Sequence, residues 1–203
     1  MAVRARYDDQ AAVRILILSL AIGITGCAGG PTPPAWQANA KGSLDAFQQA
    51  YLRGETRVAE AEFGRARAEL QSTGRADLVA RAELVRCAAR AASLEFDDCP
   101  GFEKLRADAG AEELAYADFL SGKMERTGTD DPFSRLVLHG VKFKSGKAGP
   151  ENISAAVDIS SAQGWRRPLL AWLGVQEKRA EAAGDAAALE RIRRRIALVS
   201  GKS

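Results

Sequence analysis

The sequence predicts an all-α fold, built as an array of antiparallel helical hairpins behind a short leader and a flexible tether. Alanine and arginine are abundant while Val, Ile and Thr are sparse, a balance that favours helix over strand. From Ser43 onward the apolar residues recur at helical spacing, and no stretch alternates apolar and polar residues for long enough to indicate a strand. The 203 residues leave room for one domain or two small ones, and an apolar share of 46% is typical of a globular protein.

The chain begins with the pattern of a secretory signal. A leader that contains Arg4, Arg6 and Arg14 is followed by the apolar run 15–24, which ends in small residues. A helix over this run would be about 15 Å long, half the thickness of the hydrocarbon core of a bilayer, and is therefore too short to be a stable membrane span. We expect residues 1–26 to be a signal peptide that is removed.

The last residues of this signal carry more information. Ile24-Thr25-Gly26-Cys27 resembles the bacterial lipobox, whose first two positions prefer Leu and then Ala or Ser, so that Ile24 and Thr25 are variants of the pattern. The resemblance implies that Cys27 receives a thioether-linked diacylglycerol, becomes the new N-terminus and is then N-acylated. More than one acyl chain gives a stable membrane anchor. The open alternatives are an ordinary cleaved signal with an incidental cysteine and an uncleaved anchor.

Residues 27–39 are rich in Gly and Pro and are expected to be a flexible tether for a periplasmic body over 40–203. Ala28 follows the cysteine at the position where, in the sorting rule of enteric bacteria, an Asp retains a lipoprotein at the inner membrane. The lipobox resemblance therefore implies the outer membrane. Without residues 1–26 the chain keeps 26 basic and 24 acidic side chains, a balance too near neutrality for a nucleic-acid binder.

The apolar stripes of the body follow one another in chain order. The first three run from Leu44 to Tyr51, from Ala59 to Leu70 and from Leu78 to Ala92, and Gly54 and Gly74 end the first two. The third stripe has a broad apolar arc, so we expect this helix to be central.

The second half of the body predicts a short helix and two further hairpins. The short helix is expected over 114–120. One hairpin joins 133–143 to 153–162 through the turn 145–150, and the other runs from 165 to 199 and breaks at Gly184-Asp185.

One segment resembles a tetratricopeptide repeat. Tyr51-x-x-Gly54, followed by Ala59, Phe63 and Ala66, reproduces the spacing at which that repeat packs its two helices. The final hairpin repeats the spacing more faintly, and the period of about 34 residues is not sustained. The resemblance implies an array of helical hairpins that is TPR-like.

The location that the lipobox implies also predicts the state of the three cysteines. If Cys27 carries lipid, Cys87 and Cys99 remain as a pair in an oxidising compartment, where disulfides persist. We predict a Cys87–Cys99 disulfide; the alternative is two unrelated thiols. With one histidine and no CxxC in the chain, a zinc site is not expected.

The sequence contains none of the catalytic motifs for which we searched. His139 is the only histidine, although nucleophilic hydrolases usually need one beside the nucleophile; we expect it to lie on a helix flank or in a satisfied, half-buried place. No serine lies in a GxSxG motif, no HExxH occurs, and Ala148 follows Gly146-Lys147 where a P-loop needs Ser or Thr. We predict no catalytic residue, no metal, no cofactor besides the lipid, and no identifiable small-molecule substrate.

Acidic pairs are the remaining candidates for hydrolysis, because glycosidases use two carboxylates. They occur at Asp97-Asp98, Glu112-Glu113 and Asp130-Asp131. Adjacent side chains on a helix point about 100° apart, and such pairs in turns are usually solvated or cap a helix.

A basic patch is the best surface candidate. Arg191, Arg194 and Arg195 are expected on one face of the last helix, with Arg193 beside them and with Arg166-Arg167 and Lys178-Arg179 close by in the hairpin. Such a patch can bind anionic phosphates or an acidic protein. Alternatively, cations near a helix C-terminus simply complement its dipole.

Three functional hypotheses follow. The preferred one is a non-enzymatic, lipid-anchored helical module that binds a protein partner and assists assembly of an envelope complex. The alternatives are a peptidoglycan hydrolase that acts through carboxylates and a structural lipoprotein that contacts lipopolysaccharide or peptidoglycan.

Overall fold

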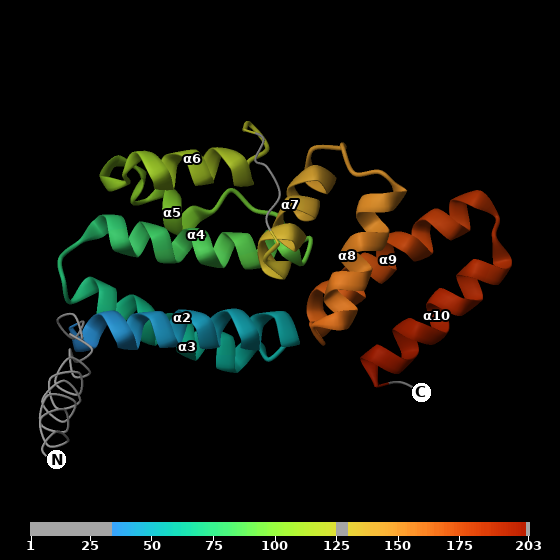
Figure 1. The fold of residues 1–203 in the computed structure, drawn as a ribbon, viewed down its shortest axis with the longest axis horizontal. Coiled ribbons are helices and arrows are strands. Elements are labelled where there is room, and N and C mark those ends of the chain that lie inside the picture. The colour runs from blue at the N-terminus through green and yellow to red at the C-terminus, as the bar shows by residue number, and fades with distance from the viewer. Residues whose placement is uncertain (1–33, 125–129, 202–203) are drawn as a thin grey trace, which may run out of the picture. The chain divides into compact units, whose positions relative to one another are not determined.

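The structure is a computed structural model that describes residues 34–124 and 130–201, and these residues form only helices, turns and loops. In chain order (Figure 1) the elements are α2 (Ala35–Arg53), α3 (Thr56–Gln71), α4 (Ala76–Ala92), α5 (Pro100–Glu103), the 3-10 helix η1 (Arg106–Asp108), α6 (Ala111–Leu120), α7 (Pro132–Lys144), α8 (Pro150–Ala162), α9 (Arg166–Ala183) and α10 (Ala186–Ser200). The all-α prediction is confirmed for this part of the chain.

The N-terminal boundary differs from the sequence-based one. Helix α2 begins at Ala35, directly after Pro34, so residues 35–39 are helical where a tether was expected. The proline has no N–H to leave unpaired and its φ is −53°, so it suits a helix start. Residues 1–26, Cys27 and the part of the expected tether up to residue 33 lie outside the described residues. None of the described helices is both long and apolar enough to cross a bilayer.

Helices α2 and α3 form an antiparallel hairpin. Gly54 ends α2 with a φ of 84°, a left-handed conformation that glycine adopts without steric cost. The rings of Phe47 and Phe63 lie 5.2 Å apart across the hairpin, and Ala59 and Ala66 are fully buried beside them. These small and aromatic residues therefore lie on the buried face of the hairpin.

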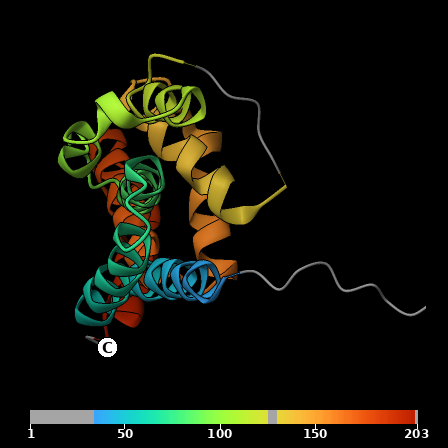
Figure 2. The same ribbon diagram turned by 90° about the vertical axis from the view of Figure 1, so that its left-hand side faces the viewer.

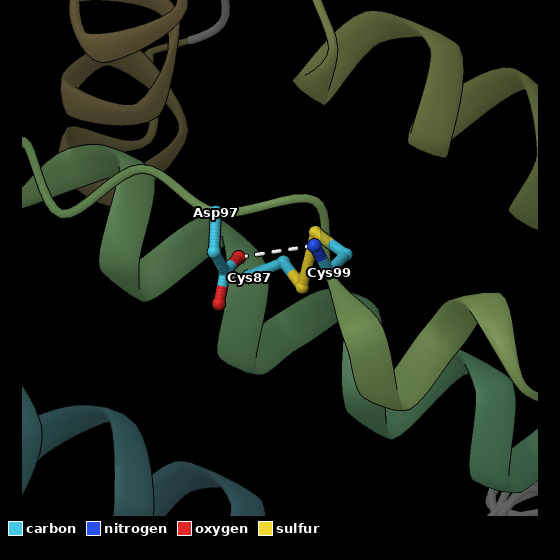
Figure 3. Close-up of side chains that lie close together, drawn as sticks. All are labelled: Cys87, Asp97 and Cys99. Carbon is cyan, nitrogen blue, oxygen red and sulfur yellow. Dashed lines mark hydrogen bonds between the residues drawn. A yellow bond between two sulfur atoms is a disulfide. The ribbon is translucent and has the colours of Figure 1, made fainter.

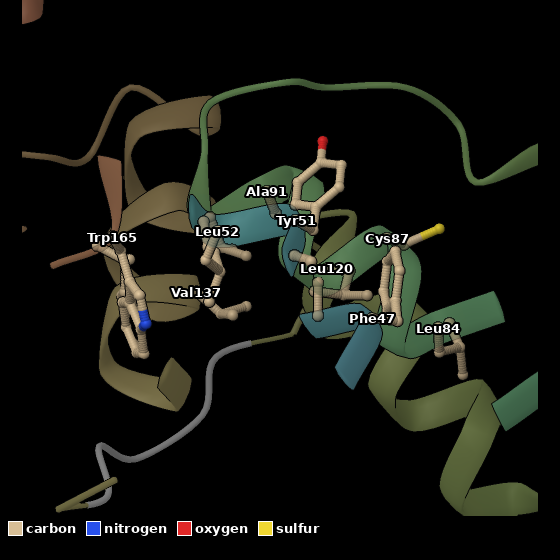
Figure 4. Packing of buried hydrophobic residues seen from close by; sticks show 14 of the residues in the cluster. Phe47, Tyr51, Leu52, Leu84, Cys87, Ala91, Leu120, Val137 and Trp165 are labelled. Carbon is tan, nitrogen blue, oxygen red and sulfur yellow. The ribbon is translucent and has the colours of Figure 1, made fainter. Parts of the chain in front are cut away.

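Helix α4 is the central element, as its broad apolar arc predicts. It contacts α2 and α3 on one side and α5, α6 and α7 on the other (Figures 1 and 2). Its buried face consists mainly of alanine, which lets several neighbours approach closely. Most of the largest fully buried side chains come from other helices, among them Phe47 on α2, Leu136 on α7 and Trp172 on α9. Figure 4 shows Phe47 on α2, Leu120 on α6 and Val137 on α7 in one cluster with Leu84 of α4.

The contact between α4 and α7 is unusually close at one glycine. A Cβ atom on Gly140 of α7 would lie 2.1 Å from the backbone carbonyl oxygen of Ala91 on α4. Only a residue without a side chain fits there. The neighbouring helix α9 is joined to the same end of α4, because Trp172 Nε1 donates a hydrogen bond to the Ala92 carbonyl oxygen at 3.1 Å.

Helix α9 departs from the arrangement of a simple linear array. It contacts α8 and α10, its neighbours in sequence, but also α2 at the start of the described chain. In a solenoid of repeats each unit contacts only its neighbours. The α2–α9 contact therefore joins the first described hairpin to the last.

Helix α10 packs chiefly on α9, and none of its residues is fully buried. The expected apolar stripe is present, but Ile192, Ile196 and Val199 are only partly covered. Leu198, outside that stripe, is 70% exposed. Among the described residues, α10 is therefore less covered than α2 and α3, both of which contact α4.

Candidate functional site

Cys87 and Cys99 form a disulfide, with their Cα atoms 5.7 Å apart, so this prediction is confirmed. Cys87 lies on the buried side of α4, and Cys99 directly precedes α5. Asp97 sets the turn between them (Figure 3): its Oδ1 accepts a hydrogen bond from the Cys99 backbone N–H at 3.0 Å, and its Oδ2 lies 3.3 Å from Arg90 Nη1. The disulfide and this turn fasten the segment after α4 back onto the helix.

The ligand-type atoms of Cys87, Asp97 and Cys99 all lie within 4.8 Å of one another, a grouping that could suit a metal ion. Metals bind the thiolate form of cysteine, and here both sulfur atoms are joined to each other. Asp97 is already used by the turn and by Arg90. The three residues therefore hold the turn after α4 in place and are not free to bind a metal ion.

Each of the three acidic pairs contains a carboxylate with a structural contact. Asp97 holds the turn before the disulfide. Asp131 caps α7, because its Oδ2 accepts a hydrogen bond from the Ser134 N–H at 2.7 Å. Glu113 of α6 is only 8% exposed and accepts hydrogen bonds at 2.8 and 2.6 Å from Arg81 of α4. These partners join helices and form caps.

The Glu113–Arg81 pair predicts a pH-dependent stability. The hydrogen bonds from Arg81 hold the pKa of Glu113 below its ordinary value of 4.5, although burial acts in the opposite direction. The pair therefore stabilises the fold above about pH 4.5, and this contribution is lost as the pH falls through the lower folded-state pKa. Because Arg81 is 59% exposed, we expect Glu113→Gln to lower the free energy of unfolding at pH 7 by only about 1 kcal/mol, and less at pH 3.

Urea unfolding at the two pH values measures this difference. Glu112→Gln is the matched control, because Glu112 is 88% exposed and lies 3.3 Å from the same arginine. It is expected to change the free energy of unfolding by less than about 0.5 kcal/mol. An equal loss in both variants, or a loss in Glu113→Gln that does not shrink at low pH, contradicts the prediction.

His139 lies half-buried on α7, as expected, but it is not satisfied: its Nδ1 has no hydrogen-bond partner among the described residues. Burial lowers the pKa of His139, and the nearby cations Lys142 and Arg135 lower it further. In a catalytic triad a carboxylate orients the imidazole and stabilises its charged form. The groups that act on His139 have the opposite charge and favour the neutral ring.

The arginines of the expected basic patch fall into two groups. Arg191, Arg194 and Arg195 are all exposed on α10. Arg194 forms an ion pair with Glu190 of the same helix, whereas Arg191 and Arg195 have no ion-pair partner among the residues the structure describes. The adjacent Arg193 is bound to two glutamates of α9, each at 2.7 Å.

Arg167 lies apart from this patch, which corrects the expected grouping. Its guanidinium donates hydrogen bonds to the Tyr51 carbonyl oxygen at 2.8 Å and to Glu95 Oε1 at 3.0 Å, and it stacks 4.2 Å from the centre of the Tyr51 ring. The Tyr51 hydroxyl donates to Glu95 Oε2 at 2.8 Å. Burial raises the pKa of Tyr51, and Glu95 raises it further. This network holds α9 against α2 and the end of α4.

An open groove of about 710 Å³ is formed by the N-terminal end of α8, the C-terminal half of α9 and the N-terminal half of α10. We call it the terminal groove. Its surface is largely apolar and contains Pro150, Ile153, Ala180, Ala183, Ala188 and Ile192. Arg179 and Arg191 line it as well, together with Gln176 and Asp185. The Asp185 side chain is used as the cap of α10, since it accepts a hydrogen bond from the Ala188 N–H at 2.9 Å.

Two other hollows are less suited to a partner. One, of about 710 Å³ between α4 and α6, is lined by the Arg81–Glu113 pair, whose charges already bind each other. The other, of about 360 Å³, lies beside the disulfide and carries a mixture of acidic and basic side chains.

The sequence indicates Arg191 as part of a basic patch, but it does not indicate the groove that this residue lines. The groove is made by three helices whose crossing is not encoded in any one apolar stripe. The one local signal is the run of alanines around Gly184, which predicts a close approach of α9 and α10 without saying that their flank stays open. Comparisons with protein-family models, curated proteins and solved structures find no match to this chain.

Proposed function

We propose that this chain is a bacterial lipoprotein, anchored to the outer membrane through Cys27, whose helical body is a non-enzymatic binding and assembly module for a protein of the envelope. The terminal groove carries the proposal. It is open, largely apolar and lined by helices, as are the surfaces on which helical arrays bind peptides or helices.

Two further observations support this function. The Cys87–Cys99 disulfide suits an oxidising compartment such as the periplasm, in agreement with the lipobox-like sequence that ends at Cys27. The α2–α3 hairpin packs Phe47 against Phe63 and buries Ala59 and Ala66, which supports the TPR-like interpretation of this segment.

The anchor is tested by mass spectrometry and fractionation of the full-length protein made in a Gram-negative bacterium. We expect a mature chain that begins at Cys27 with acyl groups attached, recovered with outer-membrane vesicles. Cys27→Ala is expected to keep residues 1–26 or to appear unlipidated, and to leave the outer-membrane fraction. An unmodified Cys27 in a full-length wild-type chain contradicts the anchor.

The binding function is tested by crosslinking the tagged, full-length protein in the bacterium that makes it. We expect one protein to be recovered in near-equal amount with the bait, and to be lost when Ala183→Trp fills the terminal groove. Ala187→Trp is the control, because Ala187 is exposed on α10 outside the groove. A folded and abundant bait that recovers nothing contradicts the proposal.

A further inference from the structure

We propose that the occupant of the terminal groove is an acidic amphipathic helix of the partner protein, which packs apolar side chains against α9 and α10 and places carboxylates against Arg179 and Arg191. This inference rests on the proposed function and identifies the chemistry of its partner. Three independent features of the groove support it.

The first feature is charge. Arg179 and Arg191 both line the groove, and neither has an ion-pair partner within the part of the chain that the structure describes. Other arginines of the same hairpin are paired: Arg193 is bound to glutamates of α9 and Arg194 to Glu190. The only acidic side chain of the groove, Asp185, is used as a helix cap. The groove therefore offers unpaired positive charge to an anionic partner.

The second feature is shape. Ala180, Ala183 and Ala188 form much of the apolar surface, and small side chains let a third helix approach a pair of helices closely. A cavity for a small molecule or acyl chain usually buries most of its ligand. An open groove between helices buries one face of an elongated partner instead, which favours a helix over a free lipid.

The third feature is the exposure of α10. This helix packs chiefly on α9, and none of its residues is buried. On α10 the groove side continues from Arg191 to Arg195 and then to Leu198, which is 70% exposed. Residues at this spacing share one flank of a helix. A partner helix would thus cover an exposed apolar residue beside two unpaired arginines.

Binding is measured by fluorescence anisotropy with the full-length protein in non-ionic detergent. The probe is a labelled synthetic helix of about four turns, with Leu and Ala on one face and Glu on the other. We expect it to bind at least tenfold more tightly than the same peptide with Lys at every Glu position, and to weaken as salt is raised.

Variants of the groove test the assigned residues. Arg179→Gln with Arg191→Gln is expected to weaken binding of the acidic peptide about tenfold, equal to 1.4 kcal/mol. Arg194→Gln is the matched control on α10, since this arginine pairs with Glu190, and is expected to change binding less than about twofold. Ala183→Trp is expected to reduce binding about tenfold and Ala187→Trp to leave it unchanged. Circular dichroism checks that each variant keeps its helices.

Equal binding of the acidic and basic peptides, or equal losses in the groove and control variants, overturns the inference. So does displacement of the peptide by vesicles of anionic phospholipid that themselves bind through Arg179 and Arg191, because the occupant is then a lipid headgroup. If the peptide does not bind while crosslinking still recovers a protein partner that is lost in Ala183→Trp, only the acidic helix as the occupant of the groove is ruled out. If the peptide binds but no partner is recovered from envelopes, the proposed function falls.

Discussion

Loss of the Cys87–Cys99 disulfide is expected to lower the free energy of unfolding by about 3 kcal/mol. The bond closes a loop between residues 12 apart in sequence, and in the chain-entropy model a loop of this size restricts the unfolded chain by about that amount. The effect is large for a domain whose total stability is expected to be about 5–15 kcal/mol. The double variant Cys87→Ala/Cys99→Ala removes the bond without leaving a buried thiol, and urea unfolding at pH 7 measures the loss.

Reduction provides an internal control for this experiment. Dithiothreitol should shift the unfolding midpoint of the wild-type protein to near that of the double variant and should leave the double variant unchanged. Without the bond, the turn from Asp97 to Cys99 is held on α4 mainly by the contacts of Asp97, so it is expected to become the first site of limited proteolysis. A wild-type midpoint that does not respond to reductant shows that the bond does not contribute.

Gly140→Ala is expected to destabilise the protein by about 2 kcal/mol, the opposite of what an alanine normally does in a helix. A helix interior gains about 1 kcal/mol from Gly→Ala. At Gly140 the new Cβ atom would lie 2.1 Å from the Ala91 carbonyl oxygen and 2.8 Å from the Ala91 carbonyl carbon. Both are backbone atoms of α4, so no side chain can rotate away and the two helices must separate. The free-energy cost of this separation exceeds the gain in helix propensity.

Gly64→Ala is the matched control for Gly140. Gly64 lies inside α3, is exposed, and has no atom within 4 Å of the position its Cβ atom would take. We expect this variant to raise the free energy of unfolding by about 0.5–1 kcal/mol. Thermal and urea unfolding of both variants give the comparison. Stabilisation by alanine at both glycines contradicts the close contact of α7 with α4.

The helices themselves could be predicted because each one carries its own apolar stripe. The stripe from Leu78 to Ala92 predicted a central helix, and α4 is central because its arc is wide enough to meet several neighbours. The short elements α5 and η1 were missed because a few residues carry no periodicity. The start of α2 was placed too late because its first turn directly follows a stretch rich in Gly and Pro, which indicated a tether.

The candidate site was less accessible to sequence reasoning because its contacts are distant along the chain. Arg167 was grouped with neighbouring cations, yet it binds the carbonyl oxygen of Tyr51, 116 residues away. Arg194 has a glutamate one turn before it, which the sequence alone shows and which predicts an ion pair. That Arg191 and Arg179 line one groove depends on how α9 and α10 cross, which their stripes do not specify.

The contact of α9 with α2 has a consequence for how the domain loses its structure. Repeat solenoids can unravel from an end, one unit at a time, because each unit depends only on its neighbours. Here Arg167 connects the last described hairpin to Tyr51 in the first and to Glu95 just beyond α4. Residues 34–201 should therefore melt in a single cooperative step, reported alike by helix signal and tryptophan fluorescence. Truncation before α9 should abolish folding, because it removes the far partner of that connection along with Trp172.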